Sequence, residues 1–474
     1  MTPALRSWPT AEPHDNLVRR SFASSKQPIP SRSTARELAQ NTPASRDRAV
    51  DFLRATSILV VMFGHWLMAS VTVRHGKFTA ANTLEAVPML QRLTWILQVI
   101  PVFFFVGGFS NSVTLSAFWR DGRTGSAFIV SRAQRLLKPV FVLLAVWIPL
   151  AFILTNIGMS RQLLGPATKL VAQPLWFIAV YFLVTALAPA MRTLHDRHRT
   201  HVPVVLAVGA IAIDALRFGF GTESFGYANL LFVWLFAQQL GFFYADGSLI
   251  RVRPTVLITT AALAFAMLIA LTTFGPYPVS MVGLPGDKVS NMNPPTLCLL
   301  VLTIMQVALV LLARPALTRW LRRERSWTRI VALNGVIMTV FLWHLSAMLV
   351  VLTVLNHFNI AQPMAGTAMW WLTRPVWFAA LIGALLPLVA TFGKLERPTP
   401  NNAGTATPKR ALTALGVFGV VVGIGGIAAT DLVQLSTPGR AHVVILTMST
   451  LQSIVLALLG AALLRPPRRS TPTV

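Results

Sequence analysis

The chain has 474 residues, of which 54% are hydrophobic and only 12% are charged. Soluble domains carry about 25% charged residues, so this composition excludes an ordinary soluble protein and indicates a membrane protein. The net charge of +26 would suit a nucleic-acid-binding protein, but the basic residues stand in short segments between apolar blocks, so we expect no nucleic acid as a partner.

The N-terminal residues 1–47 are polar, rich in Ser, Pro and Arg, and contain no apolar run. This composition predicts a disordered cytoplasmic tail. A cleaved signal peptide requires an apolar stretch near its start, and because the segment has none, we expect no signal peptide.

Beyond the tail, apolar blocks long enough to cross a membrane recur along the chain. A membrane helix needs about 20 mostly apolar residues. The sequence therefore predicts an all-α, polytopic membrane protein with about twelve transmembrane helices. The predicted spans are 55–73, 95–115, 138–158, 174–191, 202–218, 228–244, 254–274, 296–313, 330–353, 372–392, 411–429 and 442–464.

The basic residues alternate between the two sides of these spans. With the N-terminus in the cytoplasm, 32 of the 41 lysines and arginines fall in the tail, in every second loop and in the C-terminal segment. Cytoplasmic loops are enriched in Lys and Arg, so the pattern predicts that both termini are cytoplasmic. The expected location is the inner (plasma) membrane of a bacterial cell, with many passes through the bilayer.

The chain divides into a core and an extension. We expect a transmembrane core over 48–393, a polar cytoplasmic linker over 394–410, two additional transmembrane helices over 411–464 and a cytoplasmic tail over 465–474. Small residues recur in the first additional helix, at Gly416, Gly419, Gly423 and Gly426. Such spacing favours close packing of membrane helices.

The first span carries ionisable side chains, which are costly inside a membrane and therefore candidate functional residues. Arg54 and His65 are eleven residues apart, so they lie within about 20° of one helix face. Asp51 stands three residues before Arg54, near the same face. A neutral imidazole at His65, near mid-bilayer, can act as a general base. The alternative is a buried histidine that is hydrogen-bonded to a neighbouring helix.

Two further arginines precede the predicted third span. Arg132 and Arg135 are three residues apart and share a helix face on the cytoplasmic side. Two guanidinium groups in this arrangement can bind phosphates. The alternative is ordinary anchoring by positive charge at the cytoplasmic surface.

Other polar residues are weaker candidates. Asp214 either pairs with Arg217, three residues later, or contacts an acceptor. His344 is a packed, hydrogen-bonded histidine or a second substrate contact. His195, His198 and His201 have a spacing that would allow metal binding, but a solvated cytoplasmic turn explains them better, and we expect no metal site. Cys298 is the only cysteine, which excludes a disulfide framework within the chain.

Taken together, these motifs resemble the type 3 family of membrane acyltransferases. The resemblance covers roughly residues 48–390 and rests on motifs in family order: Asp51 and Arg54 followed by His65, the aromatic run Phe103–Phe109, Arg132 with Arg135, and Leu175-Trp176-Phe177. The chain departs from the family at Gly107, where many members have serine. Taken alone, the aromatic run would predict only a lipid-facing helix whose glycines allow a neighbouring helix to approach closely.

The resemblance implies an activity and a set of roles. It implies O-acyl transfer from acyl-CoA, by default acetyl-CoA, to a hydroxyl of a glycan, glycolipid or other small acceptor. His65 would be catalytic together with Arg54 and Asp51, and Arg132 and Arg135 would contact the donor. Trp176, Asp214 and His344 are weaker candidates for substrate contacts. Acyl-CoA would be a substrate, and no bound cofactor is expected.

A transporter or flippase for a lipid or sugar is the alternative function, because twelve helices with both ends inside is a common carrier architecture. Carriers are often built from internal repeats. We find no evident repeat between the halves, and the charged residues cluster in the N-terminal third of the chain. A membrane sensor or assembly protein is a third class, which would not need His65 on a charged helix face.

Overall fold

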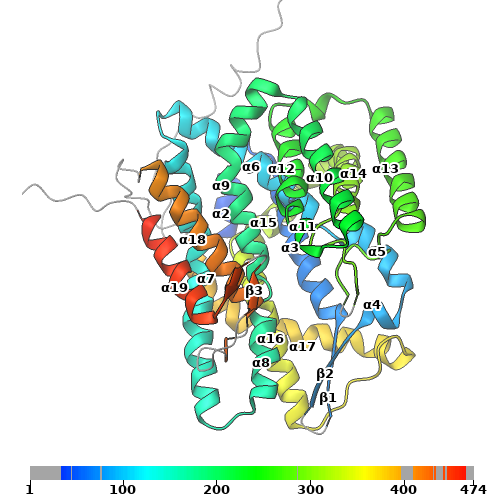
Figure 1. The fold of residues 1–474 in the computed structure, drawn as a ribbon, viewed down its shortest axis with the longest axis vertical. Coiled ribbons are helices and arrows are strands. Elements are labelled where there is room, and N and C mark those ends of the chain that lie inside the picture. Colours follow the sequence, from blue (N-terminus) through cyan, green and yellow to red (C-terminus); the bar gives the residue numbers. More distant parts are fainter. Residues whose placement is uncertain are drawn as a thin grey trace, which may run out of the picture.

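The computed structural model describes residues 34–43, 45–74, 77–284, 287–396, 409–430, 432–433, 441–443 and 446–465. Most of these residues are helical (Figure 1). The helices are α2 (Ala35–Gln40), α3 (Arg48–Met68), α4 (Thr83–Ala86), α5 (Met89–Leu97), α6 (Ile100–Arg120), α7 (Gly125–Asn156), α8 (Arg161–Ala172), α9 (Leu175–His198), α10 (His201–Phe220), α11 (Glu223–Gly226), α12 (Asn229–Ala245), α13 (Pro254–Phe274), α14 (Leu297–Leu321), α15 (Glu324–Asn334), α16 (Ile337–His357), α17 (Ala368–Phe392), α18 (Arg410–Ala429) and α19 (Thr450–Leu463), with 3-10 turns at Leu249–Arg251 and Gly393–Glu396.

Two short antiparallel hairpins complete the described secondary structure. Strands β1 (Ala69–Arg74) and β2 (Lys77–Asn82) pair with Ala69 opposite Asn82. Strands β3 (Ala441–Val443) and β4 (Leu446–Met448) pair with Ala441 opposite Met448.

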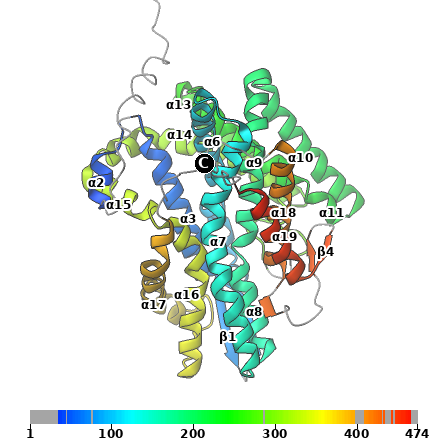
Figure 2. The ribbon, with the colours of Figure 1, turned by 90° about the vertical axis from the view of Figure 1, so that its left-hand side faces the viewer.

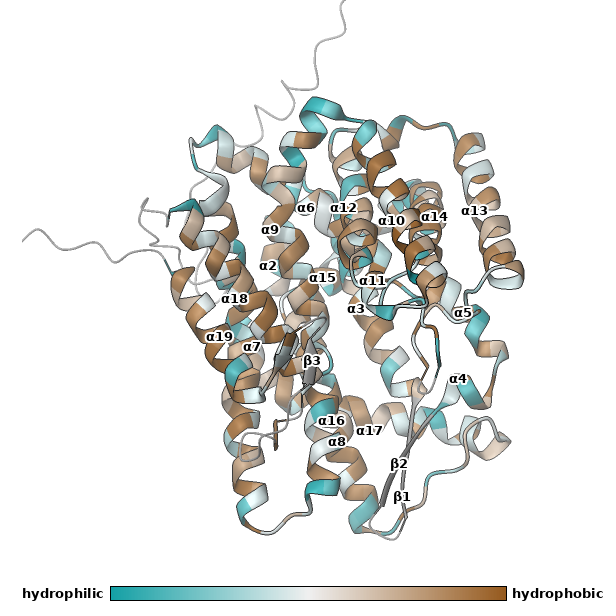
Figure 3. Cartoon of the chain, viewed as in Figure 1, coloured by the Kyte–Doolittle hydropathy of each residue, from teal (hydrophilic) through white to brown (hydrophobic). Residues whose placement is uncertain are grey.

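The predicted all-α, polytopic membrane fold is confirmed. Within the described part of the chain, eleven helical segments are long and apolar enough to cross a membrane. Hydrophobic residues make up most of the length of these helices, and hydrophilic residues are more frequent towards the helix ends and in the connecting segments (Figure 3). The predicted span 442–464 differs, because only its second part, α19, is helical, and α19 has 14 residues. A capping box of Ser449 and Gln452 starts α19 at Thr450, which explains its late beginning.

Two predicted spans begin earlier in the structure than in the sequence analysis. Helix α3 starts at Arg48 because the carboxylate of Asp47 accepts hydrogen bonds from the backbone N–H groups of Ala49 and Val50, at 3.0 and 3.3 Å. Helix α7 starts at Gly125, where Thr124 caps it, rather than near residue 138. The two arginines of the Arg-x-x-Arg motif therefore lie inside a long helix and not in the loop before it.

The predicted disordered tail over 1–47 is wrong for its last part, and residues 1–33 lie outside the described residues. Helix α2 begins with a capping box of Thr34 and Glu37. It packs on α15, where Glu324 accepts hydrogen bonds from Arg36 and Gln40, each at 3.0 Å. This tertiary contact outweighs the polar composition that suggested disorder. The predicted linker and C-terminal tail also lie mostly outside the described residues.

The segments that we predicted to be cytoplasmic meet at one end of the bundle, which we call the inner end. There, Tyr244 donates a hydrogen bond to Asp47 at 2.6 Å, and Arg48 donates one to the carbonyl of Leu321 at 2.9 Å. Figure 2 shows α2 and α15 side by side at this end of α3, with α16 and α17 together further along. The opposite end, with the turn between α7 and α8, is the outer end.

The interior is closely packed where glycines let helices approach. A side chain on Gly108 of α6 would overlap the carbonyl of Gln238 on α12. The neighbouring ring of Phe104 is buried and stacks on Trp234, with ring centres 4.7 Å apart. The aromatic run of α6 is therefore not lipid-facing, since its rings fill the space between α6, α9 and α12.

The C-terminal helices α18 and α19 form a close pair, as the spacing of small residues predicts. Gly416 and Gly419 of α18 face Gly460 of α19, and a side chain on Gly423 would overlap the backbone of Ala457. The pair packs on α9 through α18, where Val420 and Ile424 are fully buried.

Candidate active site

Two histidines from distant parts of the sequence meet in the interior of the bundle. Nδ1 of His65 on α3 lies 2.8 Å from Nε2 of His344 on α16. The rings are within 15° of parallel, and their centres are 5.1 Å apart. His344 is seven residues, or about 10 Å, from the start of α16 and about 20 Å from its end, which places the pair deep in the bundle.

Tryptophan hydrogen bonds hold the backbone around this pair. Trp66 donates from its indole nitrogen to the carbonyl of His344 at 2.9 Å, and Trp377 of α17 donates to the carbonyl of Trp66 at 2.9 Å. Both indoles are buried. Helices α3, α16 and α17 are thereby fixed to one another beside the two imidazoles.

A small cavity opens beside His65. It has a volume of about 40 Å³, enough for a few water molecules. Along α3 it follows one helix face from Ser57 to His65, and α6, α9 and α16 supply its other walls. Its lining residues are Ser57, Ile58, Val61, His65, Val99, Ile100, Phe103, Pro174, Trp176, Phe177 and Phe341. The structure thus brings Trp176 to the same cavity as His65.

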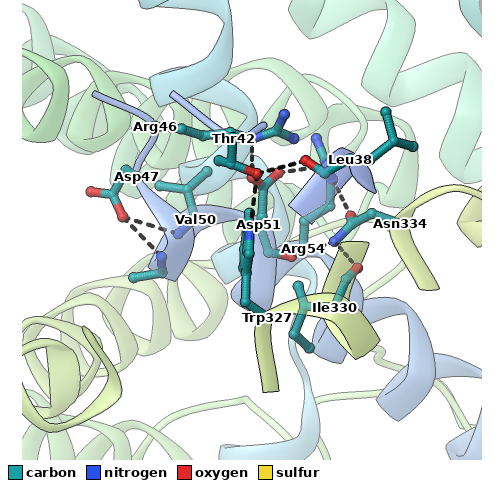
Figure 4. A network of polar contacts seen from close by, with 11 residues as sticks. Leu38, Thr42, Arg46, Asp47, Val50, Asp51, Arg54, Trp327, Ile330 and Asn334 are labelled. Carbon is teal, nitrogen blue, oxygen red and sulfur yellow. Dashed lines mark hydrogen bonds and ion pairs between the residues drawn. The ribbon is translucent and has the colours of Figure 1, made fainter. Parts of the chain in front are cut away.

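The charged entrance of α3 forms a polar network at the inner end (Figure 4). Asp51 is buried and bonds Arg54 at 2.7 Å with one carboxylate oxygen and Arg46 at 2.6 Å with the other. Arg54 also donates to the side-chain oxygen of Asn334 on α15, at 2.9 Å. Asn334 in turn donates to the backbone carbonyl of Asp51. The network fixes the Arg54 guanidinium between α3 and α15.

Asp51 and Arg54 are not in contact with His65. They lie fourteen and eleven residues before it on one helix, which corresponds to about 21 and 16 Å. The helix face that they share with His65 is the face expected from the sequence. The contacts of the Asp51 carboxylate are with Arg54 and Arg46, and Asp51 does not line the cavity.

The two arginines of α7 face the same inner region as Arg54. Arg132 donates from one terminal nitrogen to the carbonyl of Ser110 and to the hydroxyl of Thr114, at 3.1 and 2.7 Å. Its Nε is buried and finds no hydrogen-bond partner among the described residues. The positive charge of Arg54 acts on both Arg132 and Arg135. Three arginines from α3 and α7 therefore concentrate positive charge at one place.

Tyr181 is a site residue that the sequence analysis missed. Its ring lies against Gly107, where an added Cβ would be 3.0 Å from the ring and 3.4 Å from the hydroxyl. The hydroxyl interacts electrostatically with both Arg54 and Arg132. The tyrosine thus fills the space left by the glycine that departs from the family pattern. Its position four residues after Phe177, one helix turn away, is the signal that could have found it.

Asp214 and Arg217 do not pair with each other, contrary to one expectation. Asp214 accepts hydrogen bonds from Asn229, Tyr277 and the backbone of Leu297, at 2.8, 3.0 and 2.7 Å. Arg217 instead pairs with Glu223 at 2.6 Å. Both residues are buried at the outer end, where Asp214 holds the segment between α13 and α14, and neither lines the cavity.

The expectation of a solvated turn holds for two of the three histidines around the turn between α9 and α10, and fails for the third. His195 is buried, with Nδ1 2.6 Å from Nε2 of Gln239 and Nε2 3.3 Å from the carboxylate of Asp246. His198 and His201 are exposed. In the described part of the chain, no group of His, Cys, Asp and Glu residues has the arrangement of a metal site.

One more arginine stands near the histidine pair, on its outer side. Arg374 of α17 is only 4% exposed and lies over the rings of Trp370 and Trp377, at 4.5 and 5.3 Å. Its Nε bonds the carbonyl of Trp370, but one terminal nitrogen has no hydrogen-bond partner among the described residues. The hydrogen bond from the Trp377 indole to the carbonyl of Trp66, the residue after His65, links this cluster to the histidine pair.

A comparison with known protein families finds a match to most of this chain. A family model described as an acyltransferase domain matches residues 47–393, which includes the histidine pair, the cavity and the three inner arginines. The comparisons with curated proteins and with solved structures gave no match. Because the family model covers most of the chain, the chain belongs to the type 3 family of membrane acyltransferases.

Proposed function

We propose that the protein transfers an acyl group from acyl-CoA to a hydroxyl of a sugar or lipid, with His65 as the general base. The observation that carries this proposal is the position of His65 on a cavity that runs along α3 towards three clustered arginines. The family match supports acyl transfer in general terms. The donor, the acceptor hydroxyl and the acetyl group are our inferences.

The arginine cluster suits the phosphates of acyl-CoA. Guanidinium groups bind phosphate through paired hydrogen bonds, and Arg132 has a buried donor that no described residue uses. The distance of about 16 Å along α3 from Arg54 to His65 is one that a long, thin pantetheine arm can span. The apolar side chains between them, including Ile58 and Val61, suit such an arm. The cavity of about 40 Å³ must widen to admit it.

The chemistry then follows from the position of His65. Its free ring nitrogen removes the proton from the acceptor hydroxyl, and the oxygen attacks the thioester carbonyl. The new C–O bond forms as the C–S bond breaks, and the proton passes to the CoA thiolate, which leaves as the thiol. The acceptor reaches His65 from the outer side, where one terminal nitrogen of Arg374 is a donor that no described residue uses. The buried rings of Trp370 and Trp377 lie against the Arg374 guanidinium and hold it in place. Such a donor suits a hydroxyl of a sugar or of a polar lipid headgroup.

Acyl-CoA turnover by purified protein in nanodiscs tests the proposal. Release of free CoA from acetyl-CoA is followed in the presence of a membrane glycolipid extract. We expect His65→Ala to lower turnover by roughly 100-fold or more, which is the usual contribution of a general base. His201→Ala removes an exposed histidine at the inner end and serves as the control, with turnover unchanged.

A second arm tests the donor site. Arg54→Gln removes the charge that Asp51 and Asn334 hold in place, so we expect the KM for acetyl-CoA to rise by about 10- to 100-fold. Wild-type protein that neither releases CoA with several acyl lengths nor binds labelled acyl-CoA would contradict the proposed function and redirect the work to transport assays.

A further inference from the structure

The hydrogen bonds of His344 determine which of its ring nitrogens carries a proton. Nδ1 of His344 lies 2.6 Å from the backbone carbonyl oxygen of Phe341. A carbonyl oxygen only accepts hydrogen bonds, so Nδ1 of His344 must be protonated. In a neutral imidazole the other nitrogen, Nε2, then carries a lone pair. That nitrogen is the one that faces His65.

The lone pair of His344 in turn determines the tautomer of His65. The two facing nitrogens are 2.8 Å apart, closer than the roughly 3.5 Å that separates stacked ring faces, so they share a hydrogen bond. Because Nε2 of His344 accepts, Nδ1 of His65 must donate. We propose that His344 is a positioning residue that holds His65 in the Nδ1–H tautomer and leaves its Nε2 unprotonated for catalysis.

The alternative protonation states fit the site less well. If His344 carried its proton on Nε2 instead, its Nδ1 lone pair would face the Phe341 oxygen at 2.6 Å, which is repulsive. If His344 were an imidazolium, its charge would be fully buried, and no carboxylate of the described residues pairs with it. Buried charges in a membrane protein are costly without a partner. The neutral pair is therefore the state that the hydrogen bonds support.

The arrangement also explains how the proton taken from the acceptor is accommodated. The catalytic consequence rests on the proposed function. When Nε2 of His65 takes the proton from the acceptor hydroxyl, the ring becomes an imidazolium, and its Nδ1–H bond to His344 becomes charge-assisted and stronger. The proton returns from Nε2 to the departing CoA thiolate. In this role a neutral histidine occupies the place that a carboxylate has in many catalytic triads.

The tautomer is directly measurable without turnover. Protein labelled with ring ¹⁵N in its nine histidines is prepared in lipid nanodiscs, and the His65 signals are identified by comparison with His65→Gln. We expect His65 to show a protonated Nδ1 and an unprotonated Nε2 in the wild type. His344→Leu removes the nitrogen that accepts the hydrogen bond from Nδ1 of His65. In this variant we expect the His65 tautomer to shift towards the Nε2–H form. A wild-type His65 with its proton on Nε2 would overturn the inference.

Steady-state kinetics of His344 variants test the same inference through catalysis. We expect His344→Leu to lower the kcat for acetyl-CoA by about 100-fold while the KM for acetyl-CoA is unchanged, because His344 does not contact the donor. His344→Gln offers an amide oxygen near the former Nε2, so we expect it to retain kcat within about tenfold of the wild type. Recovery by glutamine but not by leucine would distinguish positioning from simple packing.

The outcomes separate the inference from the proposed function. If the wild type turns over acetyl-CoA, His65→Ala does not, and His344→Leu matches the wild type, the inference is wrong and the proposed function stands. If the wild type neither releases CoA with several acyl lengths nor binds labelled acyl-CoA, the proposed function fails, and the ¹⁵N spectrum alone decides whether His344 sets the tautomer.

Discussion

The region covered by the family match and the segments that flank it are stabilised differently. Within residues 47–393, the structure buries polar side chains that bond across helices, including Asp214 and His344. The flanking pair α18 and α19 is held mainly by small residues at a close backbone contact. The flanking α2 is held by a surface ion pair and a few apolar contacts.

This difference indicates where function resides. Buried polar groups are expensive in a membrane protein, so a chain retains them where they act on a substrate or hold a group that does. Close glycine packing stabilises a helix pair and brings no reactive group with it. We therefore infer that changes to the flanking segments alter stability more than turnover, while changes to the matched region alter both.

The largest expected effect comes from the glycine contact inside the matched region. In Gly108→Val the added side chain overlaps the Gln238 backbone and forces α6 from α12, which also disturbs the 3.1 Å bond between Asn111 and Gln238. We expect a loss of stability above about 4 kcal/mol. Size-exclusion chromatography of the detergent-solubilised protein should show little monodisperse material and no turnover. A monodisperse, active Gly108→Val variant would contradict the close approach of α6 to α12.

The equivalent change in the flanking pair should have a smaller and different effect. In Gly423→Val the side chain overlaps the backbone of Ala457, so α18 and α19 separate. We expect a loss of about 1–3 kcal/mol in thermal stability, with acetyl-CoA turnover at low temperature close to that of the wild type. Val420→Ala, on the face of α18 that packs inward, provides a comparison without a clash. Loss of turnover in a still-folded Gly423→Val would show that the pair takes part in catalysis.

The sequence predicts much of this arrangement, and the remainder depends on contacts between distant residues. The spacing of Arg54 and His65 on one face follows from helix geometry, and the glycines of α18 pack as their spacing predicts. The pairing of His65 with His344 joins residues 279 apart, and no local pattern reveals it. The partners of Asp214 come from α12, α14 and the segment between α13 and α14, so the simple prediction of a pair with Arg217 failed.

The smallest expected effect concerns α2, at the other flank. The Arg36 guanidinium and the Gln40 amide hold the pKa of Glu324 below its ordinary value of 4.5, since both bond the ionised carboxylate. A carboxylate with a lowered pKa stabilises the folded contact at neutral pH, and that contribution is lost as the pH falls through the folded pKa. We therefore expect α2 to loosen from α15 as the pH falls below 4.5, the ordinary value, through the lowered pKa of Glu324. In Glu324→Gln we expect α2 to be looser at neutral pH as well.

A spin label on α2 measures this loosening. Asn41 is exposed at the end of α2, and the native Cys298 is buried, so Asn41→Cys offers a selectively accessible thiol. Label mobility should rise on acidification in the Glu324 protein and be independent of pH in Glu324→Gln. Because both side chains of the pair are exposed and surface ion pairs contribute little, acetyl-CoA turnover should be unchanged in the variant. A fall in turnover would mean that α2 acts on the nearby Arg54 network, and the boundary between the matched region and its flanks would then have no functional meaning at this end of the chain.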